Sequence, residues 1–205
     1  PVTLVATSPN VLIVSKTFEG TLKDFIQQAQ AKPGALNYGS VGPGSASQLA
    51  MELFKRQAKI DLLHVPYKGA SPALNDVLGG NVSMGFMTAA GALPSINAGK
   101  LRPIAVAGLQ RLPQLPNVPT MKEAGVPMVA NAWYGVMLPA NAPKDIAEKL
   151  NAAFNKVLKD PEVRKSLQAI GAQVDGGSVA EFTKFSQSEI KRYEGIVKMS
   201  GAPRE

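Results

Sequence analysis

The chain has 205 residues, 45% of them hydrophobic, which is enough to bury one large core or two small ones. It has no cysteine, which excludes disulfides, thiolate metal sites and cysteine nucleophiles, and one histidine, His64, which argues against histidine-rich metal sites. The net charge of +7 comes from scattered lysines and arginines with no interleaved aromatic residues, so no nucleic-acid partner is expected. No stretch approaches the roughly 20 apolar residues of a membrane span.

Strand and helix patterns alternate along the chain. The apolar runs predict strands at 2–6, 11–15, 36–40, 62–66, 82–87, 103–107, 133–138 and near 172–174. After the last long strand the pattern is helical, at 143–159, 161–170 and 179–199. Short loops between alternating strands and helices predict a largely parallel α/β sheet, with ligands bound beyond the carboxyl ends of its strands.

Short motifs mark where the helices begin and end. Capping boxes are predicted at Thr21 with Asp24, Thr120 with Glu123, and Ser178 with Glu181. N-caps followed by proline are predicted at Ser71 and Asp160, and C-terminal glycines at Gly79, Gly99 and Gly171. Residues 109–119 contain three prolines and are expected to be irregular.

The most informative stretch is YGSVGPGSASQL, residues 38–49. A short strand leads into a glycine-rich loop, and a helix is expected to begin at Ser45. Backbone N–H groups, serine hydroxyls and the positive end of the helix dipole then surround one point, which favours an anion. The alternative is a plain strand-to-helix turn.

Two nucleotide motifs fail in this stretch. Gly39 and Gly44 have the spacing of a P-loop, but Ser45 and Ala46 stand where Lys–Ser/Thr is required. Ser47 occupies the position of the third glycine of the dinucleotide fingerprint. A small carboxylate therefore suits the loop better than a nucleotide.

Other chemistry-bearing residues have ordinary structural interpretations. His64 lies in the apolar run LLHVPY and is expected to be a strand histidine. Three apolar residues of one predicted strand, Met84, Phe86 and Met87, are expected in the core. A packing role is the default for Trp133 and Tyr134, with ligand contact as the alternative.

Three segments together resemble one known family. YGSVGPGSASQLAMELF, HVPYKGASPALNDVLGG and LRPIAVAGLQRLPQLPNVPTMKEAGVP are similar to the hallmark segments of the Bug family, the periplasmic solute receptors of tripartite tricarboxylate transporters. The resemblance implies an α/β, two-lobed type II periplasmic-binding-protein fold that closes on a small carboxylate. Many family members carry histidine where this chain has Gln48, so the role of that side chain is open.

The resemblance also implies a domain organisation. Family members begin with about one more lobe of sequence, so the chain is expected to be a fragment that lacks most of the first lobe. Residues 1–7 would be a strand crossing from lobe one, and residues 8–130 would form lobe two. Residues 131–205 would contain the hinge crossing and the helices that complete lobe one. With that lobe missing, apolar helix faces would be bare, and the segment would self-associate, pack against a neighbouring copy or become mobile.

The family's second-lobe carboxylate loop matches five residues of this chain: Ser40, Gly42, Gly44, Ser45 and Ser47. Tyr67 and Thr88 are further ligand-binding candidates because they end the next strands, and Lys68 is either in the cleft or in solvent. No cofactor, metal or catalytic residue is expected. The implied partners are a small carboxylate and the membrane components of a tripartite transporter, in the periplasm.

Three functions remain open at this point. The first is a carboxylate receptor without catalysis, which the loop and the resemblance both favour. The second is a hydrolase or transferase that uses residues 38–49 as an anion cradle, with Ser45 or Ser47 as nucleophile and His64 as the base. The third is a ligand-sensing effector domain, which would need a partner domain outside this chain.

Overall fold

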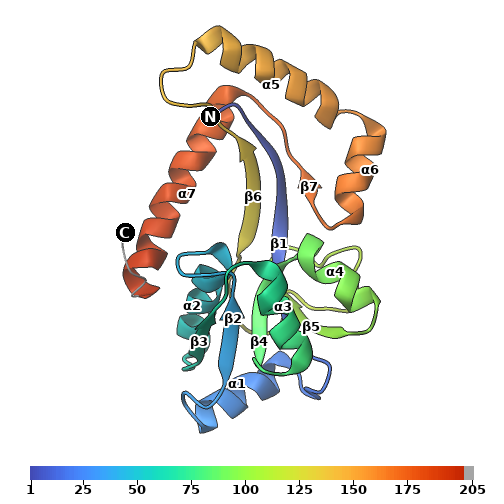
Figure 1. Cartoon of the computed structure of the whole chain (residues 1–205), viewed down its shortest axis with the longest axis vertical. Coiled ribbons are helices and arrows are strands. Elements are labelled where there is room, and N and C mark those ends of the chain that lie inside the picture. Colours follow the sequence, from blue (N-terminus) through green and yellow to red (C-terminus); the bar gives the residue numbers. More distant parts are fainter. Residues whose placement is uncertain (201–205) are drawn as a thin grey trace.

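The computed structural model describes the backbone of residues 1–200 and the side chains of residues 1–198. The elements, in chain order, are β1 (Thr3–Ser15), α1 (Leu22–Ala31), β2 (Asn37–Ser40), α2 (Ala46–Ala58), β3 (Leu63–Pro66), α3 (Ala70–Gly79), β4 (Met84–Thr88), α4 (Ala89–Asn97), β5 (Leu101–Val106), β6 (Asn131–Val136), α5 (Lys144–Leu158), α6 (Pro161–Ala169), β7 (Gln173–Val174) and α7 (Val179–Ser200) (Figure 1). Residues 109–119 form no helix or strand, as their prolines predict.

The long strand β1 joins two parts of the molecule. Its first half, Thr3 to Pro9, pairs with β6, and the same half pairs with β7 at Ala6 and Thr7. Its second half pairs with β4 and β5. The two strands predicted at 2–6 and 11–15 are therefore one continuous strand, which runs with β6 through the middle of the molecule (Figure 1).

The sheet is mixed, so the prediction of a largely parallel sheet is wrong for the sheet as a whole. The strand order is β3-β2-β4-β1-β5, and β2 is parallel to both β3 and β4. However, β1 is antiparallel to β4, β5, β6 and β7. The physical reason is that α1, which joins β1 to β2, lies at the end of the sheet where β1 finishes and does not carry the chain back across it, so β2 runs in the opposite direction (Figure 1).

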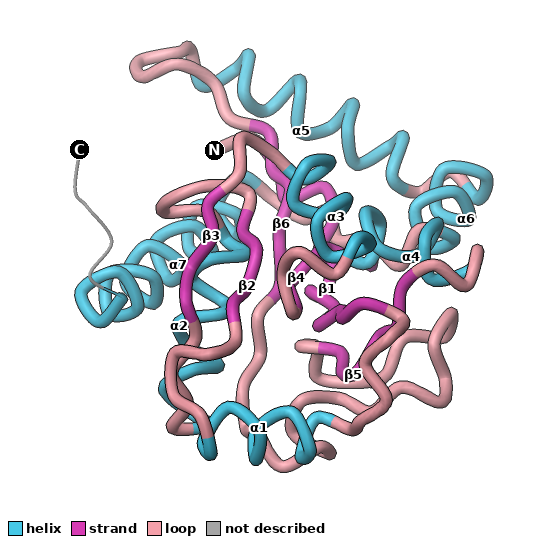
Figure 2. The backbone as a smooth tube through the Cα atoms, turned by 60° about the horizontal axis from the view of Figure 1, so that its bottom comes forward, coloured by secondary structure: helices cyan, strands magenta, loops and turns pink. Residues whose placement is uncertain are grey.

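Helices cover both faces of this sheet. One apolar cluster packs α1 and α2 against it through Phe25, Tyr38, Met51, Phe54 and Phe86. A second cluster packs α3 and α4 against the opposite face. Figure 2 shows α2 and α7 to one side of the strands and α3 and α4 to the other. The three strand residues expected in the core, Met84, Phe86 and Met87, are buried, which confirms that prediction.

Most of the predicted helix starts are correct. The Thr21–Asp24 and Ser178–Glu181 boxes form, and Asp160 caps α6 through the amides of Glu162 and Val163.

Three details of the predicted helix ends are wrong. Thr120 and Glu123 make the bonds of a capping box, but turns rather than a helix follow. Ser71 lies inside α3, whose N-cap is Gly69. The left-handed residue that ends α3 is Gly80 rather than Gly79. At Ser71 and Gly79 the local pattern is present, but the helix begins or ends one or two residues away. At Thr120 the pattern is present, but no helix follows it.

The C-terminal helices lie around the other half of β1. Trp133 of β6 makes edge-to-face contacts with Phe182 and Phe185 of α7, so its expected packing role is confirmed. The side chain of Tyr134 is about half exposed. From its contacts with Trp133, α7 runs back along the molecule to pack beside α2 (Figure 1). None of the described helices is long and apolar enough to cross a bilayer.

Candidate functional site

The ends of three neighbouring strands place the predicted ligand residues along one edge of the sheet. The parallel register pairs Tyr38 with His64 and Ser40 with Pro66, while Gly39 lies beside Gly85 of β4. The segments that follow β2, β3 and β4 therefore leave the sheet at the same edge. In sheets with parallel strands this is the edge where ligands bind.

The segment between β2 and α2, residues 41–47, is called the anion loop below. It turns through two glycines with positive φ angles, 131° at Gly42 and 71° at Gly44, which L side chains rarely adopt. Ser45 is the N-cap of α2, as predicted: its Oγ accepts from the Gln48 amide and donates to the Gly42 carbonyl at 2.6 Å. The loop is thus held closely against the start of the helix.

The hydroxyls of Ser47 in the loop and of Ser40 just before it accept from two of the loop's amides. Val41 N–H donates to Ser47 Oγ at 3.1 Å, and Gly42 N–H donates to Ser40 Oγ at 3.2 Å. Ser47 Oγ also lies 3.1 Å from Ser45 Oγ.

Two amides at the start of α2 have no such partner. Those of Ala46 and Ser47 meet no acceptor among the described residues. The first turn of α2 contains no acidic side chain. Its positive dipole end is therefore not neutralised locally, and these two amides can hold an anion.

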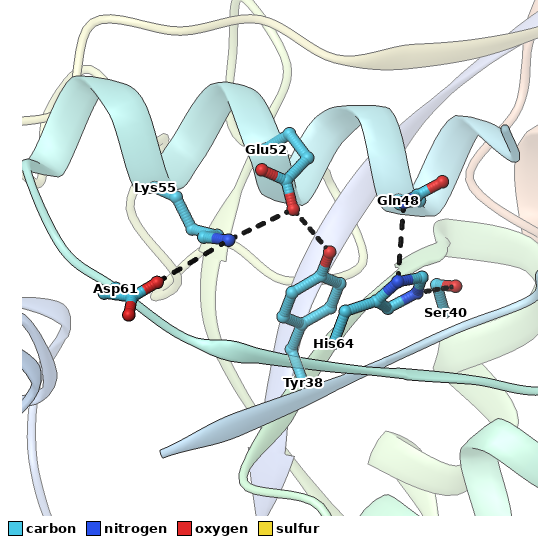
Figure 3. Close-up of polar contacts among 7 residues, drawn as sticks. All are labelled: Tyr38, Ser40, Gln48, Glu52, Lys55, Asp61 and His64. Carbon is cyan, nitrogen blue, oxygen red and sulfur yellow. Dashed lines mark hydrogen bonds and ion pairs between the residues drawn. The ribbon is translucent and has the colours of Figure 1, made fainter. Parts of the chain in front are cut away.

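A partly buried polar network lies directly behind the anion loop (Figure 3). Gln48 Oε1 accepts from the Gly44 amide at 2.6 Å, and Gln48 Nε2 lies 3.4 Å from His64 Nδ1. His64 Nε2 lies 2.7 Å from Ser40 Oγ. The imidazole stacks on the Tyr38 ring with centroids 4.8 Å apart. Burial lowers the pKa of His64, so the neutral imidazole is the favoured form.

The network continues along α2. The Tyr38 hydroxyl donates to Glu52 Oε1 at 2.6 Å, and the same oxygen lies 3.2 Å from Lys55 Nζ. Asp61 is the outer partner of Lys55, at 3.9 Å (Figure 3). Burial, together with the Glu52 hydrogen bond, raises the pKa of Tyr38, so the phenol stays protonated. The hydrogen bond to Glu52 therefore fixes the Tyr38 ring, on which the imidazole stacks.

The other two predicted ligand residues lie at the same edge, but their side chains are engaged elsewhere. Tyr67 N–H donates to the Ser40 carbonyl, whereas its hydroxyl donates to Asp76 of α3. Burial and this hydrogen bond raise the pKa of Tyr67 to about 12. Thr88 Oγ1 caps α4 by accepting from the Gly91 amide at 3.3 Å. Lys68 is exposed.

His64 lies in β3, as the sequence predicts for a strand histidine. What the sequence does not predict is its contact with Gln48, whose role it leaves open. The signal that could have found this contact is the strand register, because His64 lies beside Tyr38 only when β2 and β3 pair in parallel. From these paired positions His64 reaches Gln48 in the first turn of α2, and Tyr38 reaches Glu52 one turn later.

The serines do not form the nucleophile–base pair that an enzyme would need. His64 pairs with Ser40 rather than with Ser45 or Ser47, and Ser40 is fully buried. The Nδ1 atom of His64 faces the side-chain carboxamide of Gln48 instead of an orienting carboxylate. The described residues contain no group of three or more histidine or acidic side chains placed to hold a metal ion.

Solved structures with the same fold cover almost the whole chain. Rpa4515 of R. palustris, solved with adipate, is 35% identical, with a TM-score of 0.93 over 100% of this chain and 69% of that chain. MatC from Rhodopseudomonas palustris, solved with bound malate, is 33% identical, with a TM-score of 0.89 over 96% of this chain and 69% of that one. These similarities confirm the periplasmic-binding-protein fold that the sequence resemblance implies.

The sequence comparisons agree with the fold. Protein BugT of Bordetella pertussis is 33% identical over 204 residues, which are 98% of this chain and 63% of BugT. The matched region spans 60% of a relative from Pseudomonas sp. (strain P51) and 63% of BugT, so the chain spans about three fifths of the length of these two relatives. The model of the TctC family, described as the tripartite tricarboxylate transporter family receptor, matches residues 1–202. The chain therefore belongs to the TctC family of receptors, which includes the Bug solute-binding proteins.

Proposed function

We propose that the chain is part of an extracytoplasmic solute receptor that binds a small carboxylate at the anion loop and delivers it to a tripartite tricarboxylate transporter. The observation that carries this proposal is the pair of free amides, those of Ala46 and Ser47, at an N-terminus of α2 that has no acidic side chain in its first turn. Such donors favour an anion, and the helix dipole adds to the attraction.

The free energy of a few such hydrogen bonds is sufficient to bind a small ligand. A hydrogen bond to a charged group contributes roughly 1.5–3 kcal/mol, so a few amides and hydroxyls give useful affinity without an arginine clamp. The anion loop contains no lysine that could reach a terminal phosphate. The adipate and malate named for two similar structures belong to the same ligand class, and their binding is transferred to this chain as a proposal.

The division into lobes is also a proposal. It is supported by β1, whose halves pair with different sets of strands, and by β6, which runs beside its first half. Residues 8–130 would form lobe two, while residues 1–7 and 131–205 would belong to the hinge and to lobe one. A cleft between lobes would then open along the edge that contains Ser40, Tyr67 and Thr88.

We infer that the receptor is not an enzyme and acts in the periplasm with membrane components of the transporter. The family and the periplasmic proteins among its structural neighbours support this inference. The buried position of Ser40 and the absence of a histidine partner for Ser45 and Ser47 argue against the alternative of an acyl-transfer enzyme.

A thermal-shift screen tests the ligand class. Adipate and malate should raise the melting temperature in a concentration-dependent way, because any ligand that binds only the folded state stabilises it. ATP and NAD should have no effect at the same concentrations. Stabilisation by the nucleotides but by none of the organic acids would overturn the proposal, and turnover of an acyl or phosphoryl substrate would restore the enzyme alternative.

A further inference from the structure

The side chains behind the anion loop form a hydrogen-bonded chain that starts and ends on the loop itself. It starts at the Gly44 amide, which donates to Gln48 Oε1 at 2.6 Å. It continues from Gln48 Nε2 to His64 Nδ1 at 3.4 Å, its longest link. His64 Nε2 meets Ser40 Oγ at 2.7 Å, and Ser40 Oγ lies 3.3 Å from the Gly42 carbonyl. The chain therefore joins the two glycines at which the loop turns.

The direction of every proton in this chain follows from its first link. A backbone amide can only donate, so the Gln48 atom that faces Gly44 is the oxygen and its NH2 group faces His64. The Nδ1 atom of His64 must then accept, which places the ring proton on Nε2, where it is donated to Ser40 Oγ. The Ser40 hydroxyl proton in turn points to the Gly42 carbonyl. All the links run one way, and they require a neutral imidazole.

Protonation of the imidazole breaks this order. An imidazolium carries a proton on Nδ1, which would face the NH2 group of Gln48, so two donors would meet. A half-turn of the Gln48 carboxamide would present Oε1 to the imidazolium, but its NH2 group would then meet the Gly44 N–H, so the conflict between donors would only move to the loop. Both conflicts are removed when the carboxamide also turns away from Gly44. The Gly44 amide then has no acceptor on Gln48 and is available to an external anion.

We propose that Gln48 and His64 are positioning residues of the anion loop, and that protonation of His64 turns the Gln48 carboxamide and frees the Gly44 amide for a carboxylate. This inference rests on the proposed function, because it assumes that the loop binds a carboxylate. In the neutral state Gln48 Oε1 occupies one donor of the loop, in the way that a ligand oxygen would, and only the amides of Ala46 and Ser47 remain open.

The surroundings of His64 set when this change occurs. The titratable and charged groups that face the ring are Glu52 and Lys55 on α2 and the stacked Tyr38 on β2. Glu52 favours the imidazolium and Lys55 opposes it, and the two lie 3.2 Å apart, so their influences partly cancel. Burial is the largest influence and favours the neutral ring, so Gln48 holds Gly44 near neutral pH.

The proposal has a reciprocal consequence. If acid frees a donor that a carboxylate uses, then a bound carboxylate must favour the protonated ring. Ligand binding therefore raises the pKa of His64, and acid tightens binding as long as the ligand itself remains ionised.

Nuclear magnetic resonance of the 205-residue chain tests the hydrogen-bonded chain without any variant, because His64 is the sequence's one histidine. Nitrogen-15 spectra of the ring should show the proton on Nε2 at neutral pH. During an acid titration the Gly44 amide signal should change with the same midpoint as the ring. A ring protonated on Nδ1 alone, or a Gly44 amide that does not follow the ring, would overturn the proposal.

A matched pair of variants tests the part played by Gln48. Gln48→Glu places a carboxylate beside Nδ1 and should raise the His64 midpoint by about one unit or more, the usual effect of an adjacent opposite charge. Gln57→Glu adds the same charge at an exposed position of α2 and should move the midpoint far less. Equal shifts in the two variants would contradict the proposal. If Gln48→Glu does not fold, the wild-type titration still decides the question.

Addition of adipate separates this inference from the proposed function. Adipate should perturb the amides of the anion loop and raise the His64 midpoint. Perturbed loop amides with an unchanged His64 midpoint would refute the proposed coupling and leave the receptor function intact. If saturating adipate and malate perturb no loop amide, the proposed function fails. The acid titration of the wild-type protein still tests the series of hydrogen bonds from Gly44 to Gly42.

Discussion

At the scale of single residues, Gly44 has both a left-handed backbone and open space beside it. Its φ angle is 71°, and an added Cβ would meet no atom within 4 Å, so the space beside it is open. A side chain here is therefore opposed by backbone strain, and it would project into the space through which a ligand reaches the loop.

We predict that Gly44→Val weakens carboxylate binding at least about tenfold, which is about 1.4 kcal/mol. Gly99→Val is the matched control, because Gly99 has a φ angle of 67° and equally open space, but lies before β5 at the opposite edge of the sheet. Both variants should lose about 1–2 kcal/mol of unfolding free energy from left-handed strain. Calorimetry that finds unchanged affinity in Gly44→Val would remove the loop from the site.

The stability of the protein should depend on pH through His64. Burial lowers the folded-state pKa of His64 below the usual histidine value of about 6.5, so between these two pKa values the unfolded chain binds the proton more readily than the folded one. Stability should therefore fall as the pH drops through 6.5 and level off below the folded-state pKa. His64→Gln should lack this component in denaturant unfolding measured between about pH 7.5 and pH 5.5. An identical pH dependence in the two proteins would contradict the assigned environment of the ring.

At this scale the sequence predicts the loop but not the side chains behind it. The positions of Gly42, Gly44 and Ser45 follow from local rules for turns and N-caps, and the structure has the turn and the cap where those rules place them. The contact between Gln48 and His64 joins a helix to a strand sixteen residues later. No local rule predicts it, because it depends on how β3 aligns with β2.

At the scale of elements, the packing of β6 against α7 explains why a glycine lies at position 135. A Cβ on Gly135 would lie 2.1 Å from Phe182 Cζ, and Phe182 is buried against Trp133. The aromatic ring of α7 therefore lies directly on the backbone of β6. This contact fixes how closely the helix approaches the strand.

We predict that Gly135→Ala destabilises the protein by about 1–3 kcal/mol, the usual range for overpacking. Gly195→Ala in α7 is the contrasting variant, because nothing lies within 4 Å of an added Cβ there. It should stabilise by roughly 0.5–1 kcal/mol, since alanine is the better helix former. The two free energies of unfolding should thus change in opposite directions, and a neutral Gly135→Ala would contradict the described contact.

The positions of the helices and strands could be predicted from the sequence, but the relative direction of the strands only in part. The strands lie within a few residues of the predicted ranges because apolar runs and caps are local signals. The strands β2, β3 and β4 are parallel, as alternation with helices requires. The antiparallel direction of β1 could not be read in this way, because it depends on pairings with strands seventy or more residues later.

At the scale of the whole molecule, α5 is an unusually exposed helix. Leu158 is the one buried residue among its fifteen, and the apolar side chains of Ile146 and Val157 are 41% and 52% exposed. Soluble monomers rarely expose an apolar helix face of this kind. The expected consequence is association between copies of the chain.

We predict that sedimentation of the 205-residue chain shows self-association that rises with concentration. Val157→Lys should reduce it, because the added charge lies within the apolar face. Ala152→Lys, which adds the same charge on another face of α5, should not. A wild-type chain that stays monomeric at all concentrations and unfolds cooperatively would contradict this prediction, because the exposed face of α5 with Ile146 and Val157 would then not drive association.

The central claim is that the anion loop holds a small carboxylate, and the most direct test is a titration of the nitrogen-15-labelled chain with adipate. The account predicts saturable shifts that are largest at the backbone amides of Ala46 and Ser47, the two free donors at the start of α2. The same concentration of ATP should leave these amides unmoved. Saturable shifts centred elsewhere, or none at the loop, would contradict the account.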